Sequence, residues 1–147
     1  MKTGRIKSYK FEQTSWQESC GEILAVRHKV FMIEQHFNQA ILSDLLDPNC
    51  IHLIARNLQG MVIASGRLSL KGRIGRIAVL LPYRGVGIGS KILSELIQIG
   101  RFHKLNDISL NAELDNLSFY DAQNFMASGP VYMKKGVPHQ KLTRKLA

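Results

Sequence analysis

The chain has 147 residues, of which 45% are hydrophobic and 21% are charged. These values are typical of one globular domain, here residues 1–147, that folds without a disulfide or a structural metal. The longest uninterrupted apolar stretch, Ile77–Leu81, is far shorter than the roughly 20 residues of a membrane-spanning helix, so no membrane partner is expected. Two cysteines, Cys20 and Cys50, and the lack of an apolar signal-peptide segment after the basic start predict a cytoplasmic protein with free thiols.

The charge is strongly basic, because twenty Lys and Arg residues against eleven Asp and Glu residues give a net charge of +9. Such a surplus attracts polyanions. No basic run is long enough to form a tail, however, and the patterns typical of nucleic-acid-binding proteins are absent from the sequence. We therefore expect most of the basic side chains to be solvated. A nucleic-acid-binding protein remains the less favoured alternative, and no nucleic-acid partner is expected.

The first predicted elements are a strand and a helix. Alternating apolar residues predict a strand at Ile6–Phe11. Ser15 followed three residues later by Glu18 forms a capping box, which predicts a helix start, and apolar residues at helical spacing extend this helix to about Gln35.

Three further strands are predicted in series. Cys50–Arg56 and Met61–Leu70 flank a turn-rich segment at residues 57–60, and a third strand is expected at Arg73–Leu80. Strands joined by such short connections pair as an antiparallel meander.

The remaining elements change the pattern. A glycine-rich loop leads into a helix at Ser90–Phe102, which carries its apolar residues on one side, and a strand follows at Asp107–Ala112. We then expect a short helix and two closing strands, at Asn116–Phe125, Val131–Met133 and His139–Leu146. A meander followed by a strand, helix and strand predicts an α+β (mixed α/β) domain.

The glycine loop is the clearest candidate for binding chemistry. Gly85, Gly87 and Gly89 alternate between a strand and a helix, so bare backbone N–H groups meet the positive end of the helix dipole, an arrangement that favours phosphate. The nucleotide-triphosphate loop needs Gly-Lys-Ser/Thr, whereas Gly89 is followed by Ser90 and then Lys91. The dinucleotide fingerprint Gly-x-Gly-x-x-Gly does not match either.

The segment Arg84–Gly89, following Ile77–Val79, resembles the Gln/Arg-x-x-Gly-x-Gly/Ala coenzyme A motif of the GNAT acyltransferase superfamily. Phe119 and Tyr120 match a later feature of that superfamily. Similarity to its ElaA-like branch extends over nearly the whole chain, in the segments Arg27–Gln35, Gly75–Val79 and Gly136–His139. Two residues depart from the usual pattern: Asn124 stands where the superfamily has Gly, and Glu113 stands where the branch has Gln. Both departures bear on the acyl acceptor.

The resemblance implies a GNAT-like central mixed β-sheet flanked by helices, and an N-acetyltransferase that moves the acetyl group of acetyl-CoA to an unidentified small-molecule or peptide amine by direct attack. It implies that Val79 offers a backbone N–H to the thioester carbonyl, and that Arg84 contacts the pyrophosphate. Asn116 would contact the pantetheine, although capping the following helix is an equally simple role. The implied coenzyme-binding residues are Ile77, Ala78, Val79, Arg84, Gly85, Val86, Gly87, Ile88, Gly89, Ser90 and Asn116.

The resemblance also implies catalytic residues. Tyr120 matches the general acid that protonates the leaving thiolate. His139 is our first choice for the base, since imidazole ordinarily titrates near pH 6.5, and Glu34 is the alternative, acting through water. Local hydrogen bonding of His139 and simple packing of Tyr120 are competing interpretations. The histidine and carboxylate spacing predicts no metal site.

Two alternatives concern the whole protein. A non-catalytic sensor that binds acyl-CoA without turnover would use the same loop. A homodimer formed by pairing of the closing strands is also possible.

Overall fold

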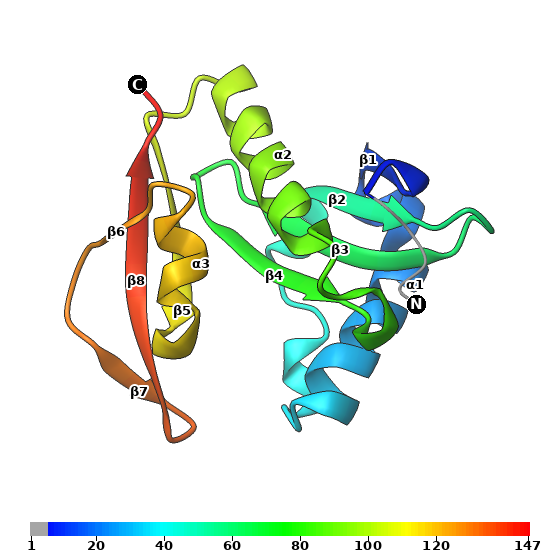
Figure 1. The fold of residues 1–147 in the computed structure, drawn as a ribbon, viewed down its shortest axis with the longest axis horizontal. Coiled ribbons are helices and arrows are strands. Elements are labelled where there is room, and N and C mark those ends of the chain that lie inside the picture. Colours follow the sequence, from blue (N-terminus) through cyan, green and yellow to red (C-terminus); the bar gives the residue numbers. More distant parts are fainter. Residues whose placement is uncertain (1–5) are drawn as a thin grey trace.

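The structure, a computed structural model, describes residues 6–147 and contains two antiparallel β-sheets with helices packed against them (Figure 1). In the first sheet the strands follow chain order, which confirms the predicted meander. Its strands are β1 (Lys10–Thr14), β2 (Ile51–Arg56), β3 (Val62–Leu68) and β4 (Ile74–Val79).

The first strand lies further along the chain than the sequence predicted. Ile6–Ser8 forms the short 3-10 helix η1, and pairing begins only with Lys10 opposite Arg56. Arg56 is the last residue of β2 before the hairpin, so residues before Lys10 have no strand beside them.

The second sheet is built around the C-terminal strand. The strand β8 (Val137–Lys145) pairs along its length with β5 (Asp107–Glu113), and on its other side with β6 (Met126–Ala127) and β7 (Tyr132–Lys134). Both predicted closing strands are present. The two-residue strand β6 was not predicted, because so short a segment has no periodicity to detect.

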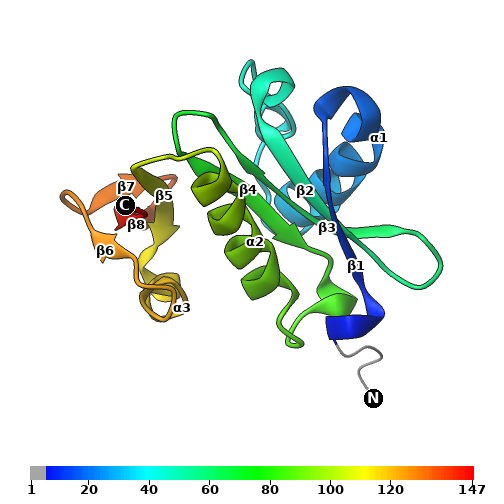
Figure 2. The same ribbon diagram turned by 90° about the horizontal axis from the view of Figure 1, so that it is seen from above.

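Two long helices cover opposite faces of the first sheet (Figure 2). Ser15 caps α1 (Trp16–Arg27) by accepting from the Glu18 N–H at 3.2 Å, as the capping box predicted. The helical run continues as a π-helix, η2 (His28–Glu34), and so ends where the sequence placed it. The helix α2 (Ile88–Phe102) packs closely on β3, because Gly66 has no side chain: a Cβ there would stand 2.8 Å from Ile92. The remaining helical segments are η3 (Gln39–Ile41), η4 (Asp47–Asn49), η5 (Leu81–Tyr83), η6 (Leu114–Asn116) and α3 (Leu117–Asp121).

The two sheets meet at one point and then diverge. Arg73 and Ser109 form an isolated parallel bridge, and the Ser109 N–H donates to the Gly72 carbonyl at 2.8 Å. Gly72 has φ +91° and a Cβ there would stand 2.6 Å from the Asp107 carbonyl oxygen, so the joint requires glycine. Beyond it the register of β4 against β3 shifts, with Arg76 at φ +52°. This bulge turns β4 away from β5, and the cleft between the sheets is the site described next.

Within residues 6–147 no helix has both the length and the apolarity that crossing a bilayer requires.

Candidate active site

The glycine loop forms the N-terminal end of α2. Gly85 and Gly87 have φ of +80° and +93°, values that favour glycine, and Gly87 caps the helix without a side chain. The first N–H groups of α2 therefore have no capping acceptor and face outward at the positive end of a 15-residue helix. This is the anion-binding geometry that the sequence predicted.

A cavity of about 460 Å³ runs from this loop along β4. We call it the coenzyme cavity. Ten of the eleven predicted coenzyme-binding residues line it, whereas Val86 instead packs half-buried against the core. The ten are Ile77, Ala78, Val79, Arg84, Gly85, Gly87, Ile88, Gly89, Ser90 and Asn116.

The backbone of Val79 faces away from β3. Val79 pairs with Ala64, and the next N–H, that of Leu80, donates to the Ile63 carbonyl at 2.9 Å. In an antiparallel ladder this pattern marks a pair whose own N–H and C=O groups point outward. The Val79 carbonyl accepts from Arg84 Nε at 2.8 Å, and its N–H lies along the open edge of β4, beside the coenzyme cavity.

Arg84 of the glycine loop forms a bidentate ion pair with Glu34 of η2. Hydrogen bonds from Arg84 lower the pKa of Glu34 below its ordinary value, and Glu34 lines neither cavity of the cleft. Arg84 also lines the coenzyme cavity, so its contact with the pyrophosphate stays a prediction. The role of Glu34 as a base acting through water stays a prediction as well, although the ion pair makes its carboxylate a weaker base. The pair positions the loop.

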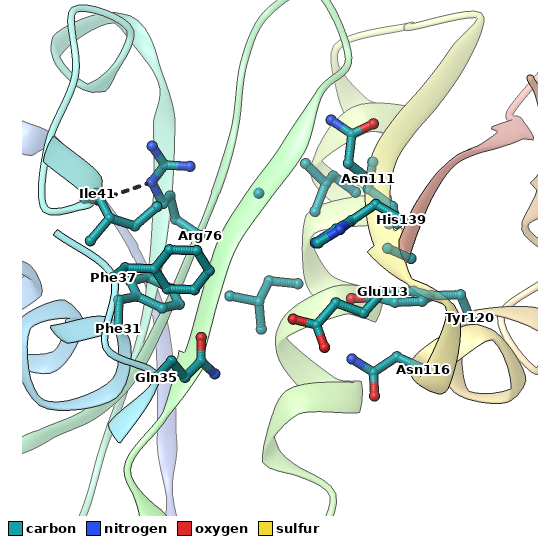
Figure 3. A pocket seen from close by; sticks show the side chains of 15 residues that line it. Phe31, Gln35, Phe37, Ile41, Arg76, Asn111, Glu113, Asn116, Tyr120 and His139 are labelled. Carbon is teal, nitrogen blue, oxygen red and sulfur yellow. Dashed lines mark hydrogen bonds between the residues drawn. The ribbon is translucent and has the colours of Figure 1, made fainter. Parts of the chain in front are cut away.

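A second, smaller cavity lies between the diverging sheets (Figure 3), and we call it the acceptor cavity. Its walls combine apolar side chains from η2 and the segment after it with polar side chains from β5, α3 and β8. It shares four lining residues with the coenzyme cavity, namely Gln35, Ile77, Asn116 and Tyr120. The two cavities thus meet in front of these residues.

His139 lines the acceptor cavity and is 8% exposed. Its Nδ1 lies 2.8 Å from the Val137 carbonyl oxygen, which can only accept, so Nδ1 carries the hydrogen. In the neutral ring Nε2 is then the proton acceptor. The ring stacks on Tyr132 with centroids 5.8 Å apart, which fixes its orientation. The local hydrogen bond that competed with a catalytic role is present, and it leaves Nε2 available.

Tyr120 is half-buried where the two cavities meet. Its ring packs edge-on against Phe119 and Phe125. Burial, and then the charge of Glu113, raise the pKa of Tyr120 above its ordinary value. The phenol therefore keeps its proton at neutral pH, as an acid must.

Asn116 does not cap α3, since its side chain makes no capping hydrogen bond. It lines both the coenzyme cavity and the acceptor cavity, and its contact with the pantetheine stays a prediction.

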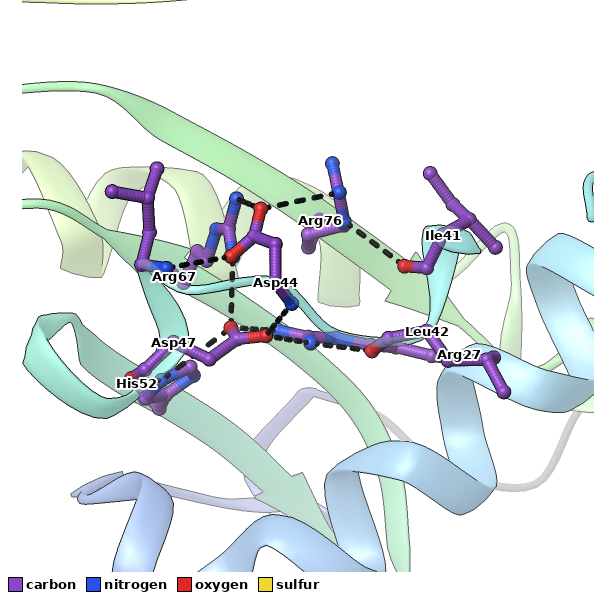
Figure 4. Close-up of polar contacts among 9 residues, drawn as sticks. Arg27, Ile41, Leu42, Asp44, Asp47, His52, Arg67 and Arg76 are labelled. Carbon is purple, nitrogen blue, oxygen red and sulfur yellow. Dashed lines mark hydrogen bonds and ion pairs between the residues drawn. The ribbon is translucent and has the colours of Figure 1, made fainter. Parts of the chain in front are cut away.

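A network of charged side chains adjoins the acceptor cavity at Arg76, and its contacts are drawn in Figure 4. Arg27 binds Asp47 through both guanidinium Nη atoms, at 2.9 and 3.0 Å, and Arg67 bridges Asp44 and Asp47 at 2.7 and 2.8 Å. Arg76 reaches Asp44 at 3.4 Å. We call these five residues the arginine–aspartate cluster. Arg27 and Asp47 have no exposed surface and Arg67 is 6% exposed, so Arg27 and Arg67 are exceptions to the solvated cationic surface expected for most basic residues.

Comparison with known proteins agrees with this geometry. The profile of the acetyltransferase (GNAT) domain matches residues 12–146. This chain belongs to the GNAT acetyltransferase family. The Bacillus subtilis protein YyaT is 29% identical over 132 residues, which cover 86% of this chain and 88% of that protein.

Solved GNAT structures share the fold. Escherichia coli ElaA superposes with a TM-score of 0.82 at 22% identity, covering 93% of this chain and 99% of that one. A GNAT family acetyltransferase from Elizabethkingia anophelis, solved with acetyl-CoA bound, superposes with a TM-score of 0.70 at 13% identity and covers 95% and 99% of the two chains. The expected GNAT-like mixed α/β architecture is confirmed.

Two residues that line the acceptor cavity of this GNAT domain, Gln35 and Arg76, were not predicted as site residues. Both lie in segments that carry the family resemblance, and that was the available signal. Glu113 was noted only as a departure from the branch pattern, and the structure places it in the same cavity. Among residues 6–147 no cluster of three His, Cys, Asp or Glu side chains is arranged to hold a metal ion.

Proposed function

We propose that this GNAT domain transfers the acetyl group of acetyl-CoA to a primary amine by direct attack, at the place where the coenzyme and acceptor cavities meet. The observation that carries the proposal is the set of residues shared by the two cavities, Tyr120 and Asn116 among them. A thioester reaching along β4 from the glycine loop and an amine in the acceptor cavity can meet only there. GNAT membership supports the cosubstrate.

The coenzyme is held by this chain's own backbone. N–H groups at the start of α2 bind the pyrophosphate. The Val79 N–H, on the open edge of β4, donates to the thioester carbonyl oxygen, and one such donor contributes about 3 kcal/mol where charge develops.

Proton removal from the amine falls to His139. An amine with a pKa of about 10.4 is mostly protonated at pH 7, at a cost of about 4.6 kcal/mol for the neutral form. His139 Nε2 accepts this proton, directly or through one water, because Nδ1 is committed to the Val137 carbonyl. The amine nitrogen then bonds to the carbonyl carbon.

Tyr120 completes the exchange. As the C–S bond breaks, its hydroxyl donates a proton to the sulfur, and the second proton lost by the nitrogen returns through water to the Tyr120 oxygen and restores the hydroxyl. The products are an N-acetyl amide and the free thiol of coenzyme A, with one proton passed to solvent through His139. Neither cysteine lies in the cleft, so no thiol of the chain is placed to form an acyl-enzyme.

The test is release of coenzyme A thiol from acetyl-CoA by the purified protein, measured with a chromogenic disulfide across a panel of primary amines. The expected result is thiol release that requires both protein and amine, with mass spectrometry showing the acetylated amine. Thiol release that no amine raises above hydrolysis, in a protein that binds coenzyme A, would overturn the proposal and favour the sensor alternative.

A further inference from the structure

The arginine–aspartate cluster contains more positive than negative charge. It has three guanidinium groups and two carboxylates, and burial lowers the pKa of the adjoining His52, which favours its neutral form. Arg27 and Arg67 hold the carboxylates at 2.7 to 3.0 Å, whereas the closest contact of Arg76 to Asp44 is 3.4 Å. The uncompensated charge therefore resides on Arg76.

Arg76 is also fixed in place beside the acceptor cavity. Its Nε donates to the Ile41 carbonyl at 3.2 Å, and its backbone has φ +52° at the bulge of β4. A non-glycine residue in this conformation carries strain that the surrounding structure must support. Burial, and then the charge of Arg67, lower the pKa of Arg76, and the opposing effect of Asp44 and Asp47 does not outweigh them.

The opposite wall of the same cavity carries an unpaired negative charge. Glu113 ends β5, and its carboxylate points into the cavity (Figure 3). This carboxylate accepts no hydrogen bond from any of residues 6–147 and forms no ion pair with them, Arg76 included. In register it lies opposite His139, on the wall that also carries Asn116 and Tyr120, where the coenzyme cavity joins.

We propose that the acceptor is a small primary amine that also carries an anionic group, its ammonium held by Glu113 and its anion by Arg76. This inference rests on the proposed acetyl transfer and names the substrate class for it. The opposite charges of Glu113 and Arg76 set the orientation of the acceptor. Its amine end lies beside His139 and Tyr120, where acetyl transfer occurs, and its anion lies at the bulge of β4. A guanidinium matches either carboxylate or phosphate, so both anions belong to the proposed class.

Amines that lack the anionic group provide no partner for the Arg76 guanidinium. A site that provides a charged hydrogen bond rejects a ligand that lacks the complementary group. Loss of one such charged contact corresponds to a decrease of about 10- to 100-fold in kcat/KM.

The experiment compares matched acceptors on the full-length protein. The series runs from glycine through the ω-amino acids to 6-aminohexanoate, each beside its carboxamide and the plain amine of the same length, with 2-aminoethyl phosphate as the phosphate probe. We expect at least one acid to exceed its amide and its amine by at least 10-fold in kcat/KM. Comparison of 2-aminoethyl phosphate with the best acid identifies the anion.

Variants assign the preference to Arg76. Arg76→Gln should lower kcat/KM for the best acid by about 10- to 100-fold and mainly through KM, with a much smaller effect on the plain amine, and Arg76→Lys should retain part of the preference. Arg101→Gln, at an exposed arginine of α2, is the matched control and should leave every rate unchanged. If Arg76→Gln fails to fold, Arg76→Lys and the wild-type series still decide the question.

Calorimetry keeps the two proposals separate. Binding of the best acid and its amide is measured on protein saturated with coenzyme A. Acetylation of plain amines without any preference for acids, or equal binding of acid and amide throughout the series, overturns the substrate class and leaves acetyl transfer standing. Absence of coenzyme A binding and of transfer to every amine overturns the proposed function itself.

Discussion

Replacing Asp47 with asparagine tests the arginine–aspartate cluster, which supports the acceptor cavity. The Asp47 carboxylate has no exposed surface and accepts four hydrogen bonds: two from Arg27, one from Arg67 and one from the Asp44 N–H. Burial alone would raise the pKa of Asp47, but the hydrogen bonds from the two arginines outweigh it and hold that pKa below its ordinary value. The carboxylate is therefore charged in the folded protein.

The cost follows from what the substitution leaves behind. The introduced side chain would turn an amide N–H₂ toward a buried guanidinium. The cluster would then contain three guanidinium groups and only one carboxylate, that of Asp44. Removing one partner of a buried ion pair typically costs 3–5 kcal/mol, because the remaining charge stays buried and uncompensated. We expect the free energy of unfolding to fall by about 4 kcal/mol, a large fraction of the roughly 5–15 kcal/mol of a typical domain.

The assay is equilibrium unfolding in urea, followed by far-UV circular dichroism at pH 7. The control is Asp121→Asn, at an exposed residue of α3, which we expect to change the free energy of unfolding by less than about 0.5 kcal/mol. A loss for Asp47→Asn below about 1 kcal/mol, with an unchanged slope on urea, would show that the cluster is not stabilised as its geometry indicates.

Further predictions concern the loop, the two proposed proton-transfer residues and acid stability. Gly87→Glu should weaken coenzyme A binding at least 10-fold in calorimetry, because φ +93° disfavours any side chain and the new carboxylate repels phosphate; unchanged affinity would refute the loop assignment. Tyr120→Phe should lower kcat by about 100-fold with little change in KM, and an equal kcat would remove the acid role. His139→Ala should flatten the acidic limb of the pH–rate profile, whereas an unaltered limb would point to Glu34 or to solvent as the base. Hydrogen bonds from Arg67 lower the pKa of Asp44 to about 2, below its unfolded value, so the stability this residue contributes is present above about pH 4 and is lost as the pH falls toward 2. This contribution is at most about 2 kcal/mol, given its partial exposure, and Asp44→Asn should make unfolding less dependent on pH across this range.

Local sequence signals predicted most of the fold. The capping box at Ser15 and Glu18 marked the start of α1, and alternating apolar residues with turn-forming segments predicted the meander. These features depend on residues close together in the chain. The start of β1 was less well predicted, because it depends on where β2 ends: Lys10 pairs with Arg56, far along the chain.

The same distinction holds for the site: features set by neighbouring residues could be predicted, and features assembled from distant residues could not. The glycine loop was predicted because its backbone conformation, with positive φ at Gly85 and Gly87, depends on its own residues. The arginine–aspartate cluster was not predicted, because no spacing pattern joins its residues. Its members Arg27, Asp44, Asp47, Arg67 and Arg76 come from four elements and one loop. No element or role was predicted between Gln35 and Cys50, yet this segment supplies both carboxylates of the cluster.

The pairing of Glu34 with Arg84 illustrates the same limit. Each residue alone suggested a role toward a ligand, as base or as phosphate contact. Only the approach of η2 to the loop shows that the two side chains hold each other.

The most direct test of the account is a crystal structure of the protein with coenzyme A and a primary amine in the cleft. The account predicts the pyrophosphate on the N–H groups at the start of α2, the sulfur within hydrogen-bonding distance of the Tyr120 hydroxyl, and the amine nitrogen on the side of His139. A coenzyme bound outside the cleft, or a sulfur directed away from Tyr120, would contradict it.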